Sequence, residues 1–166
     1  MALAGDTARV EALANDLTRL YPHDTLVRFT YAPALHALVA LARHHPAAAI
    51  DLLQANVPYE RAVPATAYNF LFGAMYPVYV RGLAYAAGGQ HAQAAAEFQK
   101  MLDNPGLLLC DPIGARARLE RARALARAGR IDDARAAYKD VLALWKDADS
   151  DSTLVRLASA ELKALG

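Results

Sequence analysis

Two segments decide the fold of this chain: "RGLAYAAGGQHAQAAAEFQKML" at residues 81–102 and "RARALARAGRIDDARAAYKDVL" at residues 121–142. Aligned on their turn glycines, they match at these pairs of positions: Arg81/Arg121, Ala84/Ala124, Ala86/Ala126, Gly89/Gly129, Ala94/Ala134, Ala96/Ala136, Phe98/Tyr138, Met101/Val141 and Leu102/Leu142. Alanine favours helix but buries little apolar area, so another helix must pack closely against such a face. The sequence therefore predicts an internal repeat of paired helices.

Composition excludes several classes of protein. The 166 residues carry 18 basic and 17 acidic side chains, which is not the basic excess that nucleic-acid backbones require. The longest apolar stretches, at 32–42 and 71–80, are shorter than the ~20 residues that span a bilayer, and the first residues lack the pattern of a signal peptide. The single cysteine, Cys110, cannot form an internal disulfide and is interpreted as a buried small hydrophobe. A cytoplasmic protein is expected.

Glycine and proline separate the expected helices along the chain. The pattern predicts helices at about 7–20, 24–43, 46–56, 77–88, 91–102, 112–128, 131–145 and 151–165, with a connector at 57–66 and a loop at 103–112. Pro33 is expected to divide or kink the second helix, and Asp24 or Thr25 to cap it. The first helix carries an apolar stripe (Val10, Leu13, Ala14, Leu17, Leu20), and so does the last (Leu154, Leu157, Ala158, Leu162, Leu165).

This arrangement of helix, glycine turn and helix resembles the tetratricopeptide repeat (TPR). In residues 75–108 the family spacing is matched by Gly82, Tyr85, Gly89, Ala94 and Phe98, with Pro105 one residue from the closing proline, and in residues 115–148 by Ala122, Leu125, Gly129, Ala134 and Tyr138. The resemblance implies an all-α fold: a right-handed superhelical, TPR-like solenoid of antiparallel helix hairpins. Small residues would lie where two helices cross, and an aromatic side chain would fill the space between hairpins.

The resemblance implies one TPR-like domain over 1–166. Its parts are a partial repeat at 5–22, a degenerate repeat at 24–57, repeats at 75–108 and 115–148, and a C-terminal capping helix at 151–165. The degenerate repeat has His44-His45 where a glycine turn is expected, which leaves its register open by one residue. Because residues 5–22 match only a second helix, the chain is expected to be a fragment of a longer protein.

A finer resemblance covers residues 76–149. The segments "AAAEFQK", "DPIGA" and "LWKDAD" are similar to C-terminal TPR regions of bacterial eukaryotic-like serine/threonine kinases and winged-helix regulators. The chain has no Gly-rich phosphate loop and no HRD or DFG signature, so kinase chemistry is not expected in it. The resemblance implies an accessory or regulatory part of a larger signalling protein.

In the TPR family the first helix of each hairpin lines a concave face. Carried over, the candidate peptide- or protein-binding residues are Tyr76, Tyr79, Leu83, Arg116, Leu119, Arg123 and Arg127. The three arginines are 7 and 4 residues apart and share one helical face, which favours an acidic segment or a C-terminal carboxylate as ligand; a solvated charged face is the alternative. Arg81 and Arg121 replace the leucine of the family pattern, so each guanidinium needs access to solvent or a hydrogen-bonding partner.

No arrangement of residues predicts catalysis, a cofactor or a metal. His36, His44 and His45 lack the spacing of a helical zinc pair, and Asp132-Asp133 suit the first turn of a helix. The expected function is a non-enzymatic scaffold for a protein or peptide, without nucleic-acid partners or membrane insertion. Self-association into a homo-oligomer is the alternative, and a metal-dependent enzyme a distant third.

Overall fold

The computed structural model describes residues 6–62, 74–108, 111–149 and 152–166, and in these ranges the regular structure is entirely helical. The α-helices are α1 (Thr7–Leu20), α2 (Ala32–Ala42), α3 (Pro46–Gln54), α4 (Tyr76–Ala87), α5 (His91–Leu102), α6 (Pro105–Leu108), α7 (Ile113–Arg127), α8 (Ile131–Leu144) and α9 (Thr153–Ala164). A π-helical segment, Val27–Tyr31, leads into α2, and a 3-10 turn, Val57–Tyr59, follows α3. The all-α class is therefore confirmed.

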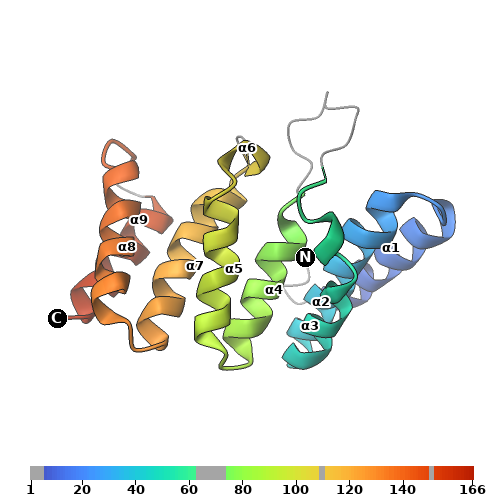
Figure 1. The fold of residues 1–166 in the computed structure, drawn as a ribbon, viewed down its shortest axis with the longest axis horizontal. Helices are drawn as coiled ribbons and strands as arrows, with labels where there is room; N and C mark the ends of the chain where they lie inside the picture. The colour runs from blue at the N-terminus through green and yellow to red at the C-terminus, as the bar shows by residue number, and fades with distance from the viewer. Residues whose placement is uncertain (1–5, 63–73, 109–110, 150–151) are drawn as a thin grey trace.

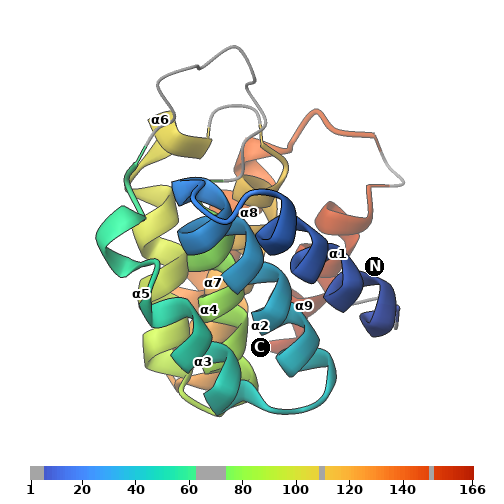
Figure 2. The same cartoon turned by 90° about the vertical axis from the view of Figure 1, so that its right-hand side faces the viewer.

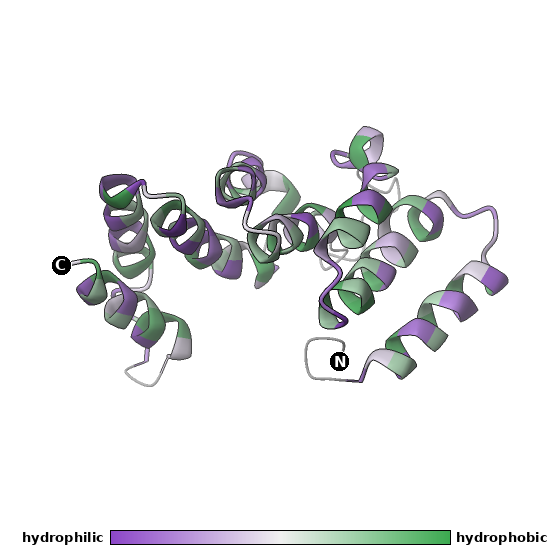
Figure 3. Cartoon of the chain, turned by 90° about the horizontal axis from the view of Figure 1, so that it is seen from below, coloured by the Kyte–Doolittle hydropathy of each residue, from purple (hydrophilic) through white to green (hydrophobic). Residues whose placement is uncertain are grey.

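The helices form a single row in which each long helix packs against its neighbours in the chain (Figure 1). Three antiparallel pairs, α2/α3, α4/α5 and α7/α8, make up its middle, with α1 at one end and α9 at the other. Seen along the row, α3 and α5 lie on one side, α9 lies on the other, and α4 and α7 run between them (Figure 2). Seen from below, the helices next to the two chain ends project from the row on the same side (Figure 3).

The three turns within the pairs have the same backbone geometry. His44, Gly89 and Gly129 adopt φ of 60°, 74° and 77°, in the left-handed region. In each turn the following amide donates to the carbonyl five residues before it: His45 to Ala40 at 2.9 Å, Gln90 to Tyr85 at 2.8 Å and Arg130 to Leu125 at 3.0 Å. These bonds satisfy the last carbonyls of the preceding helix. The register of the degenerate segment is thereby settled, because His44 occupies the position of the turn glycine.

This register places small residues at the helix crossings of all three pairs. The first helices present Ala37, Gly82 and Ala122, and the second present Ala49, Ala94 and Ala134, all of them buried. The residues four positions further along the second helices are buried and large: Leu53, Phe98 and Tyr138. The small side chains allow the paired backbones to approach, and the large ones fill the core between successive pairs.

Pro33 shapes the start of α2. A proline in a helix has no N–H to donate, and its ring pushes away the carbonyl four residues before it, here that of Phe29. The chain widens into the π-helical segment at this point, where the Ala32 amide donates to the carbonyl of Val27. The buried side chain of Asn56 donates through Nδ2 to the freed Phe29 carbonyl at 2.8 Å. The predicted kink is thus a π-helical turn that the chain after α3 holds in place.

Several local predictions need correction. Leu13 and Leu20 of the α1 stripe are 48% and 57% exposed, because α2 covers only the side that carries Val10 and Ala14. Leu157 of the α9 stripe is 39% exposed. The predicted loop 103–112 contains the short helix α6. The predictions for Gly5, Cys110, residues 63–66, Ser150 and Asp151 concern residues outside the described ranges.

Candidate functional site

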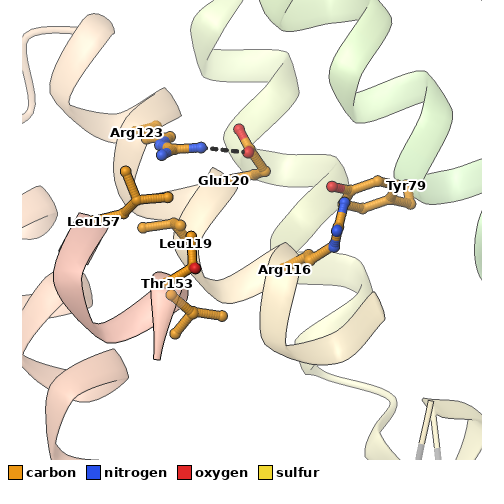
Figure 4. Close-up of a pocket in the computed structure, with 8 residues that line it drawn as sticks. Tyr79, Arg116, Leu119, Glu120, Arg123, Thr153 and Leu157 are labelled. Carbon is orange, nitrogen blue, oxygen red and sulfur yellow. Dashed lines mark hydrogen bonds and ion pairs between the residues drawn. The ribbon is translucent and has the colours of Figure 1, made fainter. Parts of the chain in front are cut away.

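An open groove of about 320 Å³ lies where α4, α7 and α9 meet (Figure 4). We call it the inner groove; it is lined by Tyr79, Arg116, Leu119, Glu120, Arg123, Thr153, Leu154 and Leu157. The lining joins a leucine-rich wall to a row of charged groups along α7. A site of this composition can hold an apolar side chain and orient it through a few polar groups. The structure thus brings together four of the predicted residues: Tyr79, Arg116, Leu119 and Arg123.

Tyr79 and Arg116 form the α4 side of the inner groove. Tyr79 is largely buried against Phe98, with ring centroids 5.7 Å apart. Burial raises the pKa of the Tyr79 hydroxyl, and Glu120 raises it further, while Arg116 and Arg123 act in the opposite direction. The guanidinium of Arg116 lies beside the Tyr79 ring (Figure 4), is exposed, and forms no ion pair with a described residue. Arg116 therefore remains open to a ligand.

Arg123 differs from Arg116, because carboxylates of the chain itself accept hydrogen bonds from its guanidinium. Its Nε donates to Glu161 of α9 at 2.8 Å, and its Nη1 donates to Glu120 at 2.7 Å. Tyr138 also donates its hydroxyl to Glu161, at 2.9 Å. Hydrogen bonding to Arg123 is the main cause that lowers the pKa of Glu161, while burial and the bond to Glu161 raise that of Tyr138. Arg123 thus ties α7 to α9, and its guanidinium already has carboxylate partners within the chain.

The other predicted residues lie outside the inner groove. Tyr76 is exposed at the start of α4, Leu83 is half-buried against the core, and Arg127 is exposed at the end of α7. Sequence reasoning missed the α9 wall, formed by Thr153, Leu154 and Leu157. The available signal was the apolar stripe of the last helix, which includes Leu154 and Leu157.

The histidines are spread over the row. His44 and His45 are exposed at the turn before α3, and His36 is half-buried on α2. Among residues 6–62, 74–108, 111–149 and 152–166, no three His, Cys, Asp or Glu side chains come together in a way that could hold a metal ion. Within the same ranges, none of the helices combines the length and the apolar character needed to cross a membrane.

Comparisons of the chain with protein-family models, with curated proteins and with solved structures found no match. The geometry of the inner groove and of the row of helix pairs therefore carries the functional proposal.

Proposed function

We propose that this chain is a TPR-like solenoid that acts as a non-enzymatic scaffold and binds a protein or peptide in the inner groove. The repeated register of the three helix pairs supports the solenoid, because each pair buries its core against the next. The right-handed superhelix, the division into repeats and the capping role of α9 belong to this proposal. So does the role of an accessory region in a larger signalling protein, which rests on the resemblance alone.

The single observation that carries the binding function is the composition of the inner groove. Leu119, Leu154 and Leu157 present an apolar wall, and Leu157 leaves 39% of its surface exposed. Arg116 stands across from this wall, and its guanidinium forms no ion pair with any carboxylate in the described part of the chain. An apolar anchor beside a charged group that fixes orientation is the pattern of a site for an extended peptide.

The ligand that fits this groove is a peptide with one apolar side chain and one nearby carboxylate. The apolar side chain would cover Leu157 and its neighbours, and the carboxylate would accept from the Arg116 guanidinium. Because Arg123 is already paired, the acidic preference depends on Arg116 rather than on three arginines. Such an exposed charge pair is worth only ~0–1 kcal/mol, so apolar contact must supply most of the affinity.

Selection from a displayed random-peptide library tests this function. The parent chain should enrich peptides with an apolar residue and an acidic residue at a fixed spacing. Leu157→Glu should lower that enrichment at least tenfold. Arg116→Glu should abolish the preference for an acidic residue in the selected peptides. Circular dichroism should show an unchanged fold, because both side chains are exposed.

Two exposed positions outside the inner groove provide matched controls. Leu144→Glu changes a leucine of α8, and Arg156→Glu changes an arginine of α9 that does not line the groove. Both variants should select the parent's peptides. Equal loss in these controls, or no enrichment by the parent chain, would overturn the proposal. Stoichiometric metal after chelation and reloading would overturn its non-enzymatic part.

Self-association is the second candidate, because α1 leaves a large apolar surface uncovered. Leu13, Leu20 and Tyr21 are each about half exposed at one end of the row. A second copy that packs on α1 would remove this surface from water. Light scattering over a range of concentrations decides it: a mass that stays at the monomer value would reject this function, and Leu13→Glu with Leu20→Glu should dissociate any dimer.

A further inference from the structure

Arg81 and Arg121 occupy equivalent positions in two successive helix pairs but have different surroundings. Both lie eight residues before the turn glycine, on the first helix of a pair. Arg81 of α4 is only 2% exposed, whereas Arg121 of α7 is half-buried. The partners of Arg81 therefore indicate which group a guanidinium at the position of Arg121 can bind.

Internal carboxylates satisfy Arg81. Its Nε donates to Glu97 of α5 at 3.1 Å, its Nη2 is also bonded to Glu60, and its Nη1 donates to the Leu53 carbonyl at 3.4 Å. Lys100 pairs with both glutamates, at 3.0 Å to Glu60 and 3.1 Å to Glu97. Two acids and two bases thus balance in this cluster, as a buried guanidinium requires.

Arg121 lacks these partners because the equivalent positions have changed. Ala137 stands where Glu97 stands in the preceding pair, and Asp140 stands where Lys100 does. A cleft of about 290 Å³ lies there between α5, α7 and α8, lined by Gln99, Leu102, Arg118, Arg121, Ala137 and Asp140. Neither Arg118 nor Arg121 forms an ion pair with Asp140 or with any other described residue.

We propose that this outer cleft binds the side-chain carboxylate of a protein or peptide partner. Arg118 and Arg121 are three positions apart on α7, so their like charges lie close together and repel. Two arginines and Asp140 give the outer cleft a formal charge of +1. A single carboxylate neutralises this charge, whereas a doubly charged phosphate would make the cleft net negative. A carboxylate is also the group that satisfies Arg81 at the equivalent position.

The outer cleft is separate from the inner groove. At about 100° per residue, Arg118 and Arg121 lie roughly 140–160° around α7 from Arg116. The outer cleft is completed by α5 and α8, whereas the inner groove is completed by α4 and α9. The two sites can therefore be tested independently, and a negative result for one proposed site does not contradict the other.

Titration of the ¹⁵N-labelled chain at low salt tests the outer cleft, with the arginine Nε–Hε resonances as the readout. The probe is N-acetyl-glutamate N-methylamide, which carries one side-chain carboxylate; its glutamine counterpart and inorganic phosphate are the comparison ligands. Saturable shifts of the Arg118 and Arg121 resonances are expected with the glutamate compound alone. No saturable shift, an equal shift with the glutamine compound, or tighter binding of phosphate would overturn the proposal.

Three variants complete the test. Ala137→Glu places a carboxylate at the position that Glu97 has in the preceding pair. The new carboxylate should pair with Arg121 and weaken probe binding at least tenfold. Ala137→Gln fills the same space without charge and should weaken binding less. Arg156→Glu, on α9 and in the lining of neither site, should leave the titration unchanged. If Ala137→Glu keeps its circular dichroism spectrum and still binds the probe like the parent, the assignment is wrong.

Discussion

Gly82 of α4 lies directly against the ring of Phe98 on α5. A Cβ atom at Gly82 would stand 2.6 Å from Cε1 and 2.8 Å from Cζ of that ring, closer than carbon atoms can pack. Phe98 is fully buried, so the ring has no free space to move into. The contact between these two residues sets how closely α4 and α5 approach.

Gly82→Ala should therefore destabilise the chain by ~1–3 kcal/mol through overpacking. Denaturant unfolding followed by circular dichroism measures the loss. Gly106→Ala is the matched control, because nothing lies within 4 Å of a Cβ atom built there.

A double substitution separates overpacking from a change in helix propensity. The first helix pair carries Ala37 and Leu53 at the equivalent positions, so Gly82→Ala with Phe98→Leu reproduces that combination. The cost of Gly82→Ala should fall when Phe98 is already leucine. Additive costs would contradict the assigned contact.

Ala134 is fully buried at the crossing of α8 with its neighbours. Ala134→Leu should overpack this crossing and cost ~1–3 kcal/mol, seen as a lower midpoint in thermal melts. Ala136→Leu adds the same side chain to the exposed side of α8 and should melt within a few degrees of the parent. Equal melting of Ala134→Leu and the parent would show that residues 115–148 are misaligned.

His44 adopts φ of 60°, a conformation that costs a residue with a Cβ ~1–2 kcal/mol. His44→Gly should remove that cost and stabilise the chain by ~0.5 kcal/mol, since the added freedom of glycine in the unfolded state offsets part of the gain. His45→Gly, at φ of −111°, should give no gain. Chemical denaturation of both variants measures the difference, and a gain at His45 alone would contradict the turn geometry.

Sequence patterns predicted most helix boundaries within one to three residues, because local signals fix them. Pro46 begins α3 as expected, and the glycine turns end α4 and α7 at the predicted positions. The turn at His44 carried no such signal, since histidine rarely adopts a positive φ. Its register follows from the backbone of the folded chain, where His44 has a positive φ and the His45 amide donates to the Ala40 carbonyl, and from the burial of Ala49 and Leu53.

The candidate site was less predictable, because it depends on contacts between distant segments. Arg123 pairs with Glu161, which is 38 residues further along the chain. That contact depends on how α9 returns across α7, and no periodicity within α7 or α9 specifies that direction. The same path brings Leu157 to the inner groove instead of the core. The sequence could propose an arginine face but could not show which arginine was already paired.

The pair formed by Arg123 and Glu161 predicts a pH dependence of stability. The folded-state pKa of Glu161 lies below its ordinary value of 4.5, mainly because Arg123 donates hydrogen bonds to it. The stabilisation that this ion pair contributes is therefore fully present at pH values above 4.5, and it is lost as the pH falls through the folded-state pKa of Glu161. Glu161→Gln should be less stable than the parent at pH 7, with a difference that narrows towards pH 3.

Unfolding free energies at both pH values test this dependence. Asp51→Asn is the control, because Asp51 is exposed on α3 and forms no ion pair with a described residue, so this variant should show little difference from the parent at either pH. A gap between Glu161→Gln and the parent that stays constant from pH 7 to pH 3 would show that the ionised carboxylate contributes nothing.

Arg81 should be the most sensitive charged residue in the described chain. Arg81→Ala leaves the buried carboxylate of Glu60 and the largely buried carboxylate of Glu97 with Lys100 as their only cationic partner among the described residues, so it should cost ~3–5 kcal/mol. Arg121→Ala removes the same side chain from the equivalent position, where no carboxylate of a described residue pairs with it, and should change stability by only ~0.5 kcal/mol. Denaturant unfolding of the two variants measures both values. Similar losses in both would mean that Arg121 is paired within the free chain, which would also remove the basis for a carboxylate ligand in the outer cleft.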